Sequence, residues 1–478
     1  MDAEVLIVGA GPTGLLLAGD LAEAGVAVTV LERQPLQQSN LTRAFAVHAR
    51  TLEVLDARGV ADELVRTGQR VGRLRLLDSA TLPFDGLPSR FPFVLVTPQY
   101  QTEQVLARRA EAAGARFEHG LEVVALRQDR EGVEVDVRAG EGAGDAGVRT
   151  LRAAYLVGTD GVHSTVRQEL GEAFPGHPVV RSMMLADVRL TEQPPSPLTV
   201  NAGEPGLVLI APFGEGWYRV VAWDRHDQRP DSDPVDVERL RELVRRVLGT
   251  DYGMHEVRWT SRFHSDERQV AHYRVGRAFL AGDAAHVHSP AGGQGMNTGL
   301  QDAANLGWRL VAALRGWAPS NVPGAPDVLD GYQAERHRVG RLVLRGSGGI
   351  IRAGLIPSAA LRRLRNVLLG VVSRVPVLTG KVTGAISGVS IRYPAPKGAH
   401  RLVGSRAPDL ALLGDDADRL YQALRCGQFV LLTSADSARE VSGWTGPVRR
   451  VTPLQPLDVD MLVRPDGYVA WAADHQKP

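Results

Sequence analysis

The sequence predicts an α/β protein built on a Rossmann-like dinucleotide-binding domain. The prediction begins at Glu4–Val8, an apolar run that is followed by the turn Gly9-Ala10-Gly11-Pro12-Thr13-Gly14. A helical pattern then extends to about Ala24, and Val26–Leu31 is predicted to be a second strand that ends at Glu32. Strand, glycine turn, helix, strand and acid in this order are typical of a βαβ unit that binds a dinucleotide.

Each glycine of this turn has its own expected role. Gly9 permits the tight turn, Gly11 lets a pyrophosphate approach, and Gly14 lets the helix pack on the strand. The N-terminus of the helix offers N–H groups and a positive dipole to the phosphates. Glu32 is placed to accept hydrogen bonds from both ribose hydroxyls and would repel a 2′-phosphate, so FAD or NAD is expected here and NADP is not.

A second match to the same glycine pattern, Gly142–Gly147, has a different interpretation. It lies between Val133–Val137, which alternates apolar and charged residues, and the strand-like Leu151–Val157. No helical pattern follows it, so we predict a hairpin loop rather than a second Rossmann domain.

A second motif follows the predicted strand Ala154–Gly158, with the sequence Thr159-Asp160-Gly161. Asp160 at the carboxyl end of a strand would lie near the cofactor crevice of a dinucleotide fold. The alternative is an ordinary strand end followed by a helix that Ser164 or Thr165 caps.

A third motif follows the predicted strand Ala278–Ala281. Asp283 can accept hydrogen bonds from ribityl hydroxyls, and the turn Gly292-Gly293-Gln294-Gly295, shortly after Pro290, lets the backbone pass close to a flat ring. This arrangement favours a flavin, although a glycine-rich structural turn would also explain it in isolation.

A helix is predicted to start just after this turn and to run towards Leu314. Thr298 and Gln301 have the spacing of a capping box, with Asn297 as a competing cap. The N–H groups of Gly295, Met296 and Asn297 are expected to face the flavin and to stabilise the negative charge of its reduced form.

The segments GAGPTG…E, TDGVHSTVR and AGDAAH…GGQGMNTG, in this order, resemble those of the single-component flavoprotein aromatic hydroxylases, the p-hydroxybenzoate hydroxylase-like FAD monooxygenases. The resemblance implies that NADPH or NADH reduces FAD and that O₂ then gives a flavin C4a-hydroperoxide. One oxygen atom would reach an electron-rich carbon of the substrate, and the other would leave as water.

The C-terminal segment LVRPDGYVAW resembles the subset of this family that acts on large aromatic polyketides, phenols and rifampicin-like compounds. That subset carries a thioredoxin-like C-terminal domain. Since the chain has no CxxC pair, the domain is expected to be redox-inactive. Rifampicin-type enzymes favour a second arginine at the position where this chain has Phe45. Hydroxylation of a polycyclic, polyketide-type phenol is therefore favoured over inactivation of a rifampicin-like antibiotic.

The resemblance also implies site residues. Arg43 would lie beside the flavin and the nicotinamide path, Gln99 (with Gln101 as second choice) would contact the ribityl chain, and the Val123 backbone would lie near the adenine. The residues expected to be catalytic are Arg43, Gly295 and Met296. The residues expected to bind cofactor are Gly9, Gly11, Pro12, Thr13, Gly14, Glu32, Arg33, Arg43, Gln99, Val123, Asp160, Asp283, Pro290, Gly293, Gly295, Met296 and Asn297. No metal is expected, and His286 and His288 are interpreted as packed residues without a catalytic role.

Four segments are expected along the chain. The FAD-binding domain is formed by residues 1–174 and by residues 266–394, the second of which includes a helical tail. Residues 175–265 form a mixed-sheet substrate-binding domain, and residues 395–478 form the thioredoxin-like domain. The insertion is predicted to contain strands and a helix that cover the flavin and form the ceiling of the substrate pocket. The strands are Val179–Leu190, Gly206–Pro212, Trp217–Trp223 and Glu256–Phe263, the helix is Val235–Leu248, and the candidate lining residues are Phe45, Phe93, Phe213 and Trp217.

Composition limits the other possibilities. Lys and Arg number 55 against 54 Asp and Glu, so neither a nucleic acid nor a membrane partner is expected. The single cysteine, Cys426, and the first strand near Glu4 favour a cytoplasmic protein without a signal peptide. Arg352–Arg374 is predicted to be one amphipathic basic helix with a solvated arginine face.

Three other functions share features with this sequence. A flavin-dependent halogenase needs a Trp-x-Trp-x-Ile-Pro segment and an active-site lysine, and no lysine precedes Lys381. A Baeyer–Villiger oxygenase or epoxidase on the same scaffold stays open, as does a catalytically idle FAD-binding protein. The sequence names no convincing catalytic base and does not predict the oligomeric state.

Overall fold

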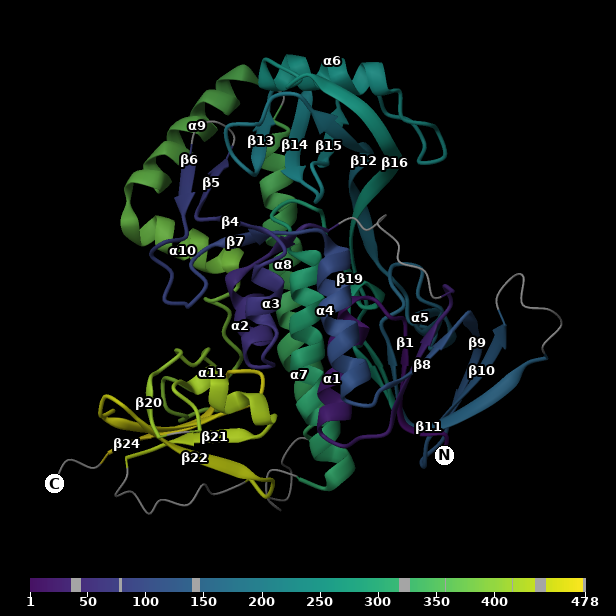
Figure 1. The fold of residues 1–478 in the computed structure, drawn as a ribbon, viewed down its shortest axis with the longest axis vertical. Coiled ribbons are helices and arrows are strands. Elements are labelled where there is room, and N and C mark those ends of the chain that lie inside the picture. The colour runs from purple at the N-terminus through teal and green to yellow at the C-terminus, as the bar shows by residue number, and fades with distance from the viewer. Residues whose placement is uncertain are drawn as a thin grey trace.

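The computed structural model describes residues 1–35, 44–76, 80–139, 147–317, 327–356, 358–414, 416–434 and 444–475. Figure 1 shows three layers of the molecule from top to bottom. A sheet with helix α6 lies at the top, a dinucleotide-binding domain lies in the middle, and a small C-terminal sheet lies at the bottom.

The central sheet has the strand order β17-β18-β11-β1-β2-β8. Strands β18, β11, β1, β2 and β8 are mutually parallel, and their buried runs are almost wholly apolar, as parallel strands covered on both faces require. Helix α1 packs between α4 and α7 beside this sheet. The strands are β1 (Ala3–Val8), β2 (Val28–Glu32), β8 (Arg116–His119), β11 (Arg149–Gly158), β17 (Arg274–Val275) and β18 (Ala278–Leu280), and the helices are α1 (Pro12–Glu23), α4 (Gln99–Ala112) and α7 (Gly295–Arg315). The Rossmann-like fold class predicted from the sequence is therefore confirmed.

A meander extends this sheet. Strand β10 (Val133–Ala139) pairs antiparallel with both β9 (Leu121–Gln128) and β11. Of the second glycine-pattern match, Gly142–Gly147, only Gly147 lies within the described residues. The strands on either side of it pair antiparallel, as the hairpin interpretation requires.

Short elements connect β2 to α4. Strands β3 (Ala46–Val47) and β4 (Gln69–Val71) both pair with β7 (Val94–Val96), and β5 (Arg73–Leu76) forms a hairpin with β6 (Ala80–Pro83). Helix α2 (Ala49–Asp56) is wholly buried, and α3 (Ala61–Val65) follows it.

The inserted sheet has the order β13-β14-β15-β12-β16-β19 and is antiparallel at each pairing. The inserted part of the chain combines a sheet with a helix, as predicted. Its strands do not run in mixed directions, because every pairing is antiparallel. Helix α6 (Val237–Leu248), capped by the side chain of Asp236, packs on one face of the sheet. The strands are β12 (Gly176–Leu190), β13 (Thr199–Ala202), β14 (Gly206–Pro212), β15 (Tyr218–Asp224), β16 (Met254–Gln269) and β19 (His286–Val287).

The helical tail differs from the prediction of one helix over Arg352–Arg374. Helix α8 (Asp330–Gly354) ends first, and α9 (Ala359–Arg374) begins after Ser358, whose side chain accepts from Leu361 N. Helix α10 (Pro376–Ser387) follows α9 at an angle of 98°. Within the described residues no single helix has the length and apolarity to cross a membrane, and only the bent pair α9 and α10 together meets that test.

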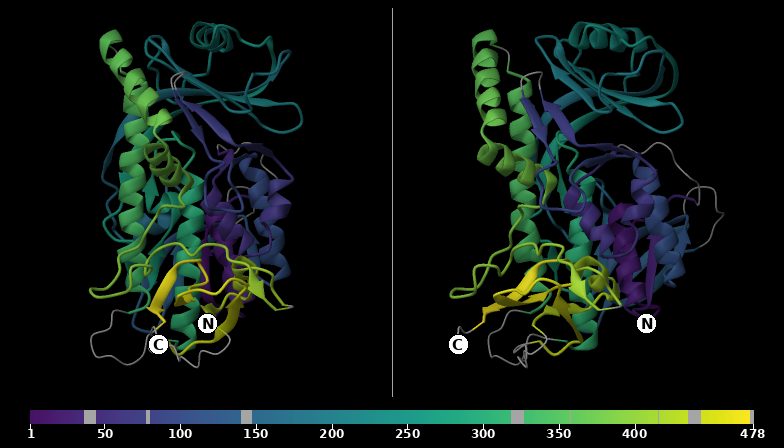
Figure 2. Two further views of the ribbon diagram at one scale, coloured as in Figure 1. Left: turned by 90° about the vertical axis from the view of Figure 1, so that its left-hand side faces the viewer. Right: turned by 60° about the vertical axis from the view of Figure 1, so that its left-hand side comes forward.

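The C-terminal part forms a thioredoxin-like sheet of order β20-β22-β21-β23-β24, in which β21 and β22 are parallel. Figure 2 shows this sheet from two further sides, beside the lower end of helix α7, where Trp308 packs on Phe429 of β21. Its elements are β20 (Leu412–Leu413), α11 (Leu420–Ala423), β21 (Phe429–Leu432), β22 (Val448–Pro453), β23 (Val459–Val463) and β24 (Val469–Asp474).

Candidate active site

The three sequence motifs come together at one edge of the central sheet. They follow β1, β11 and β18, which are neighbouring parallel strands and so end on the same side. Thr159 donates from its backbone N and from Oγ1 to Val8 O, at 2.8 and 2.9 Å, which joins the second motif to the first. Ala281 N donates to Gly158 O at 3.0 Å, which joins the third motif to the second.

Thr13 is the point where the first and third motifs pack. A Cβ on Gly299 of α7 would lie 2.4 Å from Thr13 Oγ1, and one on Gly282 would lie 2.8 Å from it. A side chain at either position would therefore collide with Thr13 unless the structure shifted, and Gly282 also has φ +60°. Arg167 adds a further tie, since its Nη1 donates to Ala284 O at 3.1 Å.

A cavity of about 230 Å³ opens at this edge between the first two motifs and β9. Its lining includes Gly9, Gly11, Glu32, Val123 and Asp160, all of which the sequence had assigned to the cofactor. Arg33 also lines it and is exposed.

The glycines at this edge test whether the site fits FAD. The Cβ of a residue at position 14 would lie 2.1 Å from Gly9 O, and Gly9 has φ +101°, so the fold itself requires both glycines. Gly11 differs, because its φ of −73° suits any residue and a Cβ there would meet no atom within 4 Å. Gly295 likewise has nothing within 4 Å of its missing Cβ. The protein leaves open space at the two positions where a bound pyrophosphate and a bound ring would need it, so the residues fit the cofactor.

Glu32 lies at the carboxyl end of β2 and faces the glycine turn. Its Oε2 accepts from Ala10 N and its Oε1 from Gln34 N, both at 2.8 Å. Each carboxylate oxygen retains a lone pair for a further donor, such as a ribose hydroxyl.

Both interpretations of the second motif, a helix start and a part of the cofactor crevice, apply to Asp160. Ser164 caps α5 (Thr165–Glu169) and accepts from Arg167 N at 2.9 Å, while Asp160 accepts from Ser164 Oγ and from Val166 N. Burial raises the pKa of Asp160 despite these hydrogen bonds. The residue therefore organises the helix start and also lines the cavity.

Helix α7 begins three residues earlier than the predicted capping box, with Gln294 as its N-cap. Thr298 does not cap it, since Thr298 Oγ1 donates back to Gln294 O at 2.9 Å. The capping-box prediction is wrong because the helix already begins at Gly295, which places Thr298 inside its first turn rather than at its N-cap. Among the described residues, the N–H groups of Gly295, Met296 and Asn297 find no acceptor, as expected in the first turn of a helix.

The side chain of Asn297 holds this helix start against β3. Its Nδ2 donates to Ala46 O at 2.9 Å and to Gly293 O at 2.7 Å, and its Oδ1 accepts from His48 N at 2.8 Å. These contacts use the Asn297 side chain within the protein, so only its backbone N–H is oriented for a ligand.

The remaining residues of the third motif surround the same turn. Asp283 lies exposed in a 3-10 turn (Gly282–Ala284), and exposed Pro290 accepts from Gly293 N at 3.0 Å. Gly293 has φ +62°, and a Cβ there would lie 2.9 Å from Ala46 Cβ. Met296 is half-buried and packs against the main core.

Two of the predicted cofactor-binding residues, Arg43 and Gln99, lie outside the three motifs. Arg43 lies outside the described residues, so its expected place beside the flavin stays a prediction. Gln99 starts α4, where its Oε1 accepts from Ala44 N at 3.3 Å and its Nε2 donates to Glu103 at 2.8 Å. Gln99 therefore contacts the backbone of Ala44, the first described residue after position 43.

A buried polar group behind the third motif was missed from the sequence. Asp302 on α7 accepts from Gly282 N at 3.1 Å, from His286 Nε2 at 2.6 Å and from Arg336 Nε at 2.6 Å. Burial opposes its ionisation, but Arg336 and His286 outweigh that effect and lower the pKa of Asp302. The only signal in the sequence was an acid within an apolar helical pattern.

His286 is packed and hydrogen-bonded, as expected, but His288 is only packed. Both ring nitrogens of His288 are buried and have no hydrogen-bond partner among the described residues. Burial and the neighbouring His286 lower the pKa of His288 to about 3, so it is neutral at physiological pH.

The four aromatic candidates for pocket lining separate into two pairs. Phe45 and Phe93 pack into the main core. Phe213 and Trp217 lie in the turn between β14 and β15 of the inserted sheet, where Arg219 covers the Phe213 ring at 3.5 Å and Arg258 covers the Trp217 ring at 4.6 Å. Phe213 also meets Tyr100 of α4 edge to face, next to Gln99.

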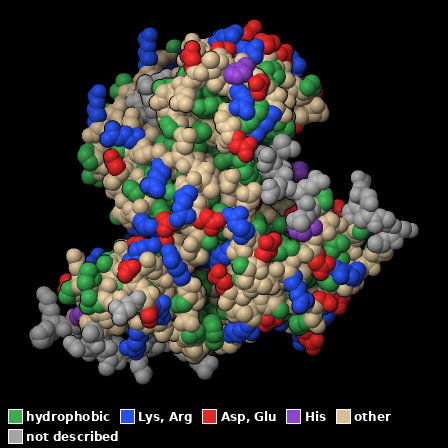
Figure 3. All heavy atoms as spheres, in the orientation of Figure 1, with side chains coloured by type: hydrophobic (Ala, Val, Ile, Leu, Met, Phe, Trp, Pro, Cys, Tyr) green, Lys and Arg blue, Asp and Glu red, His purple; other side chains and the backbone are tan. Residues whose placement is uncertain are grey.

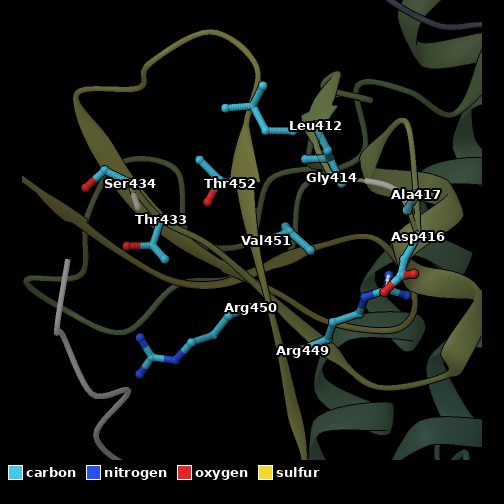
Figure 4. Close-up of a pocket in the computed structure, with 11 residues that line it drawn as sticks. Leu412, Gly414, Asp416, Ala417, Thr433, Ser434, Arg449, Arg450, Val451 and Thr452 are labelled. Atoms are coloured by element: carbon cyan, nitrogen blue, oxygen red, sulfur yellow. Dashed lines mark ion pairs between the residues drawn. The ribbon is translucent and has the colours of Figure 1, made fainter. Parts of the chain in front are cut away.

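A second cavity, of about 300 Å³, lies in the C-terminal sheet (Figure 4). Its lining comes from β20 and the loop after it, from β22, and from the two residues that follow β21, and Arg449 pairs there with the exposed Asp416 at 4.0 Å. None of its lining residues belongs to the three motifs.

Comparison with known proteins agrees with this geometry. The FAD binding domain family matches residues 2–347, and the aromatic-ring hydroxylase C-terminal family matches residues 400–478. The chain therefore belongs to the FAD binding domain family and carries the C-terminal domain of the aromatic-ring hydroxylases. It is an FAD-dependent monooxygenase with NAD(P)H as co-substrate.

Individual relatives cover almost the whole chain. A rifampicin monooxygenase of Streptomyces venezuelae is 39% identical, over 99% of this chain and 96% of its own. The 12-dehydrotetracycline 5-monooxygenase/anhydrotetracycline 6-monooxygenase of Streptomyces rimosus is also 39% identical, with the same coverage. The crystal structure of CabE, an aromatic hydroxylase from angucycline biosynthesis, matches with a TM-score of 0.85 and 37% identity over 99% of this chain and 96% of that one.

Proposed function

We propose that this monooxygenase hydroxylates a polycyclic, polyketide-type phenol with O₂ as the oxidant. The observation that carries the proposal is the composition of the inserted sheet on the face away from α6. Leu185, Val221 and Trp223 on that face form one cluster with Ala291, the residue before the glycine turn of the third motif. These side chains are buried together with Ile351 of α8 and form an apolar wall that reaches the ring-binding turn, which suits a flat polycyclic substrate.

Cations on the same sheet favour a phenol over a plain hydrocarbon. Arg219 is fully buried and pairs with Asp187 at 2.8 Å, whereas Arg258 lies 3.6 Å from that carboxylate and its side chain is 25% exposed. Arg258 is therefore the cation with access to a ligand, and its charge would favour the phenolate form, which is the more electron-rich.

FAD, when bound, supplies the oxygen chemistry, and the chain supplies the surroundings. The N–H groups of Gly295, Met296 and Asn297 would hold negative charge on the ring, and Gly11 and Glu32 would hold the pyrophosphate and the ribose. Arg43 would act at the approach of the nicotinamide. The domain division into residues 1–174, 175–265, 266–394 and 395–478 belongs to the same proposal.

The test is product analysis with isotopically labelled O₂. FAD-loaded protein, NADPH and a panel of polycyclic phenols are incubated under ¹⁸O₂, and each product is examined by mass spectrometry. Hydroxylation adds one labelled oxygen atom to a ring carbon and leaves the carbon skeleton intact.

Other products would replace the proposal. A labelled lactone oxygen would indicate a Baeyer–Villiger oxygenase, and a labelled epoxide an epoxidase. Consumption of NADPH with hydrogen peroxide as the sole product for every compound would contradict hydroxylation of this substrate class.

A further inference from the structure

The outward face of α9 is apolar rather than basic. Leu361, Leu364, Leu368 and Val371 are 53%, 54%, 57% and 48% exposed. Their spacing of three, four and three residues places them in one stripe along the helix. Val375, between the two helices, and Leu378, in the first turn of α10, are also exposed, at 38% and 39%. A contiguous exposed apolar surface of this kind marks an interaction site.

Contacts on the inner side of α9 fix this orientation. Arg365 is buried, and its Nη1 donates to Ala353 O at the end of α8 at 2.8 Å. Thr379 Oγ1 donates to Val372 O at 2.6 Å, which ties α10 to α9. Helix α9 also packs on the β6 strand. The stripe therefore cannot turn inward without the loss of these contacts.

The surrounding sequence is strongly basic, although the whole chain has a formal charge of only +1. Between Glu335 and Asp409 there are fourteen Lys or Arg residues and no Asp or Glu. Arg363 and Arg374 lie on α9 beside the stripe and make no hydrogen bond or ion pair with any described residue. Figure 3 shows hydrophobic and basic side chains along the edge of the molecule where α9 lies.

We propose that this α9 face (Leu361, Leu364, Leu368 and Val371 with Arg363 and Arg374) docks on the surface of an anionic lipid bilayer. A helix with an apolar face and basic residues beside it lies in the interface of a membrane, where the apolar residues enter the acyl region and the cations meet acidic headgroups. The 98° bend returns the chain to the protein at α10, whose Thr379, Thr383 and Ser387 are buried. The contact is therefore peripheral and does not span the bilayer.

Charge complementarity selects a bilayer over a second copy of this chain. Two copies of α9 packed against each other would bring Arg363 and Arg374 of one copy towards the same cations of the other, and the segment offers no carboxylate to neutralise them. An anionic bilayer supplies both a negative surface and an apolar layer. Since polycyclic apolar compounds partition into bilayers, docking would bring the enzyme to where such a substrate concentrates. The proposal itself stands without the proposed reaction.

Vesicle flotation of the FAD-loaded full chain tests the docking. Vesicles of phosphatidylcholine alone are compared with vesicles of phosphatidylcholine and phosphatidylglycerol in equal parts, at low and high salt. We expect binding only to the mixed vesicles, with a loss at high salt. R363Q/R374Q should lower the partition coefficient roughly tenfold or more, and L364Q/L368Q should lower it at least as much.

The control L413Q/L454Q alters two leucines of the C-terminal sheet that are each 54% exposed, and it should bind as the unaltered protein does. Melting temperature and bound FAD should be the same in all four proteins, because every altered side chain is at the surface. Absence of binding to the mixed vesicles, equal binding to both kinds, or an equal loss in the control would overturn the proposal. A dimer that L364Q/L368Q dissociates, without vesicle binding, would assign the α9 face to a second copy.

Discussion

At the scale of single residues, the glycines distinguish what the fold needs from what the cofactor needs. Gly14 and Gly9 are in contact with the protein itself, and Gly11 faces only the cavity. The sequence predicted all three from one pattern, because the spacing GxGxxG follows from the tight turn and the helix packing. It could not predict Asp302, because the partners of that carboxylate, Gly282, His286 and Arg336, are set by packing between helices.

Gly11→Ala should weaken FAD binding without unfolding the protein. Its backbone conformation is ordinary and the added methyl meets no protein atom, so the apoprotein should keep its stability. The methyl would instead crowd the bound FAD and weaken its binding by about 1–3 kcal/mol. We expect a Kd for FAD raised roughly five- to a hundredfold and a nearly unchanged melting temperature of the apoprotein, measured by fluorescence titration and thermal unfolding.

Gly14→Ala is the matched comparison. Its Cβ would lie 2.1 Å from Gly9 O and 2.6 Å from Thr159 Oγ1, so the apoprotein itself should lose stability. If both variants bound FAD as the unaltered protein does, the cavity at the first motif would not be the dinucleotide site.

At the scale of elements, the strands were easier to predict than the helix starts. The alternation and apolar runs of β1, β11, β14 and β15 follow directly from burial, and the predicted strands lie within a few residues of those observed. The start of α7 was misplaced because Thr298 and Gln301 match a capping box by spacing alone. The structure places the hydroxyl of Thr298 on the carbonyl of Gln294 instead.

Asn297→Ala should destabilise the start of α7. The variant removes three hydrogen bonds and leaves His48 N buried without an acceptor, which should lower the free energy of unfolding by about 1–3 kcal/mol. Denaturant unfolding measures the loss, and FAD affinity should fall with it because the ring-binding turn is released from β3.

Thr298→Ala provides the control at the adjacent buried position. Gln294 O still accepts from Thr298 N at 2.8 Å, so less than about 1 kcal/mol should be lost. Equal losses in the two variants would show that the Asn297 contacts do not hold the helix start.

At the scale of the whole molecule, a buried ionic network joins the C-terminal sheet to the flavin domain. Arg464 binds Glu335 of α8 through two hydrogen bonds of 2.7 and 2.9 Å, and Arg50 of α2 bonds Glu53 and Tyr421. The Arg464–Glu335 and Arg50–Tyr421 bonds join residues more than a hundred positions apart, so no local pattern in the sequence indicates them. The basic character of Arg352–Arg374 was predicted from the sequence, whereas the exposure of the apolar side of α9 depends on how this helix packs on α8 and β6.

Glu335→Gln should change how stability depends on pH. Burial opposes ionisation of Glu335, but Arg464 and Arg309 lower its pKa to about 2 from 4.5. A carboxyl whose pKa is lowered by folding stabilises the protein above its unfolded pKa, and that contribution disappears as the pH falls from about 4.5 to about 2. E335Q should therefore be less stable than the unaltered protein at neutral pH, by about 3 kcal/mol. It should also lose less stability than the unaltered protein as the pH falls.

Chemical unfolding at a series of pH values measures this difference, with E192Q as the control, since Glu192 is exposed and has no ion pair among the described residues. Parallel pH profiles for E335Q and the unaltered protein would show that the network contributes nothing through Glu335.

The central claim, that this chain is an FAD-dependent monooxygenase acting on polycyclic phenols, is tested most directly by anaerobic reduction. FAD-loaded protein is mixed with NADPH, and bleaching of the flavin absorbance is followed with and without the phenol panel. We predict that at least one polycyclic phenol accelerates bleaching and is hydroxylated when air is admitted. If neither NADPH nor NADH reduces the bound FAD under any of these conditions, the protein is an idle FAD-binding protein and the claim is wrong.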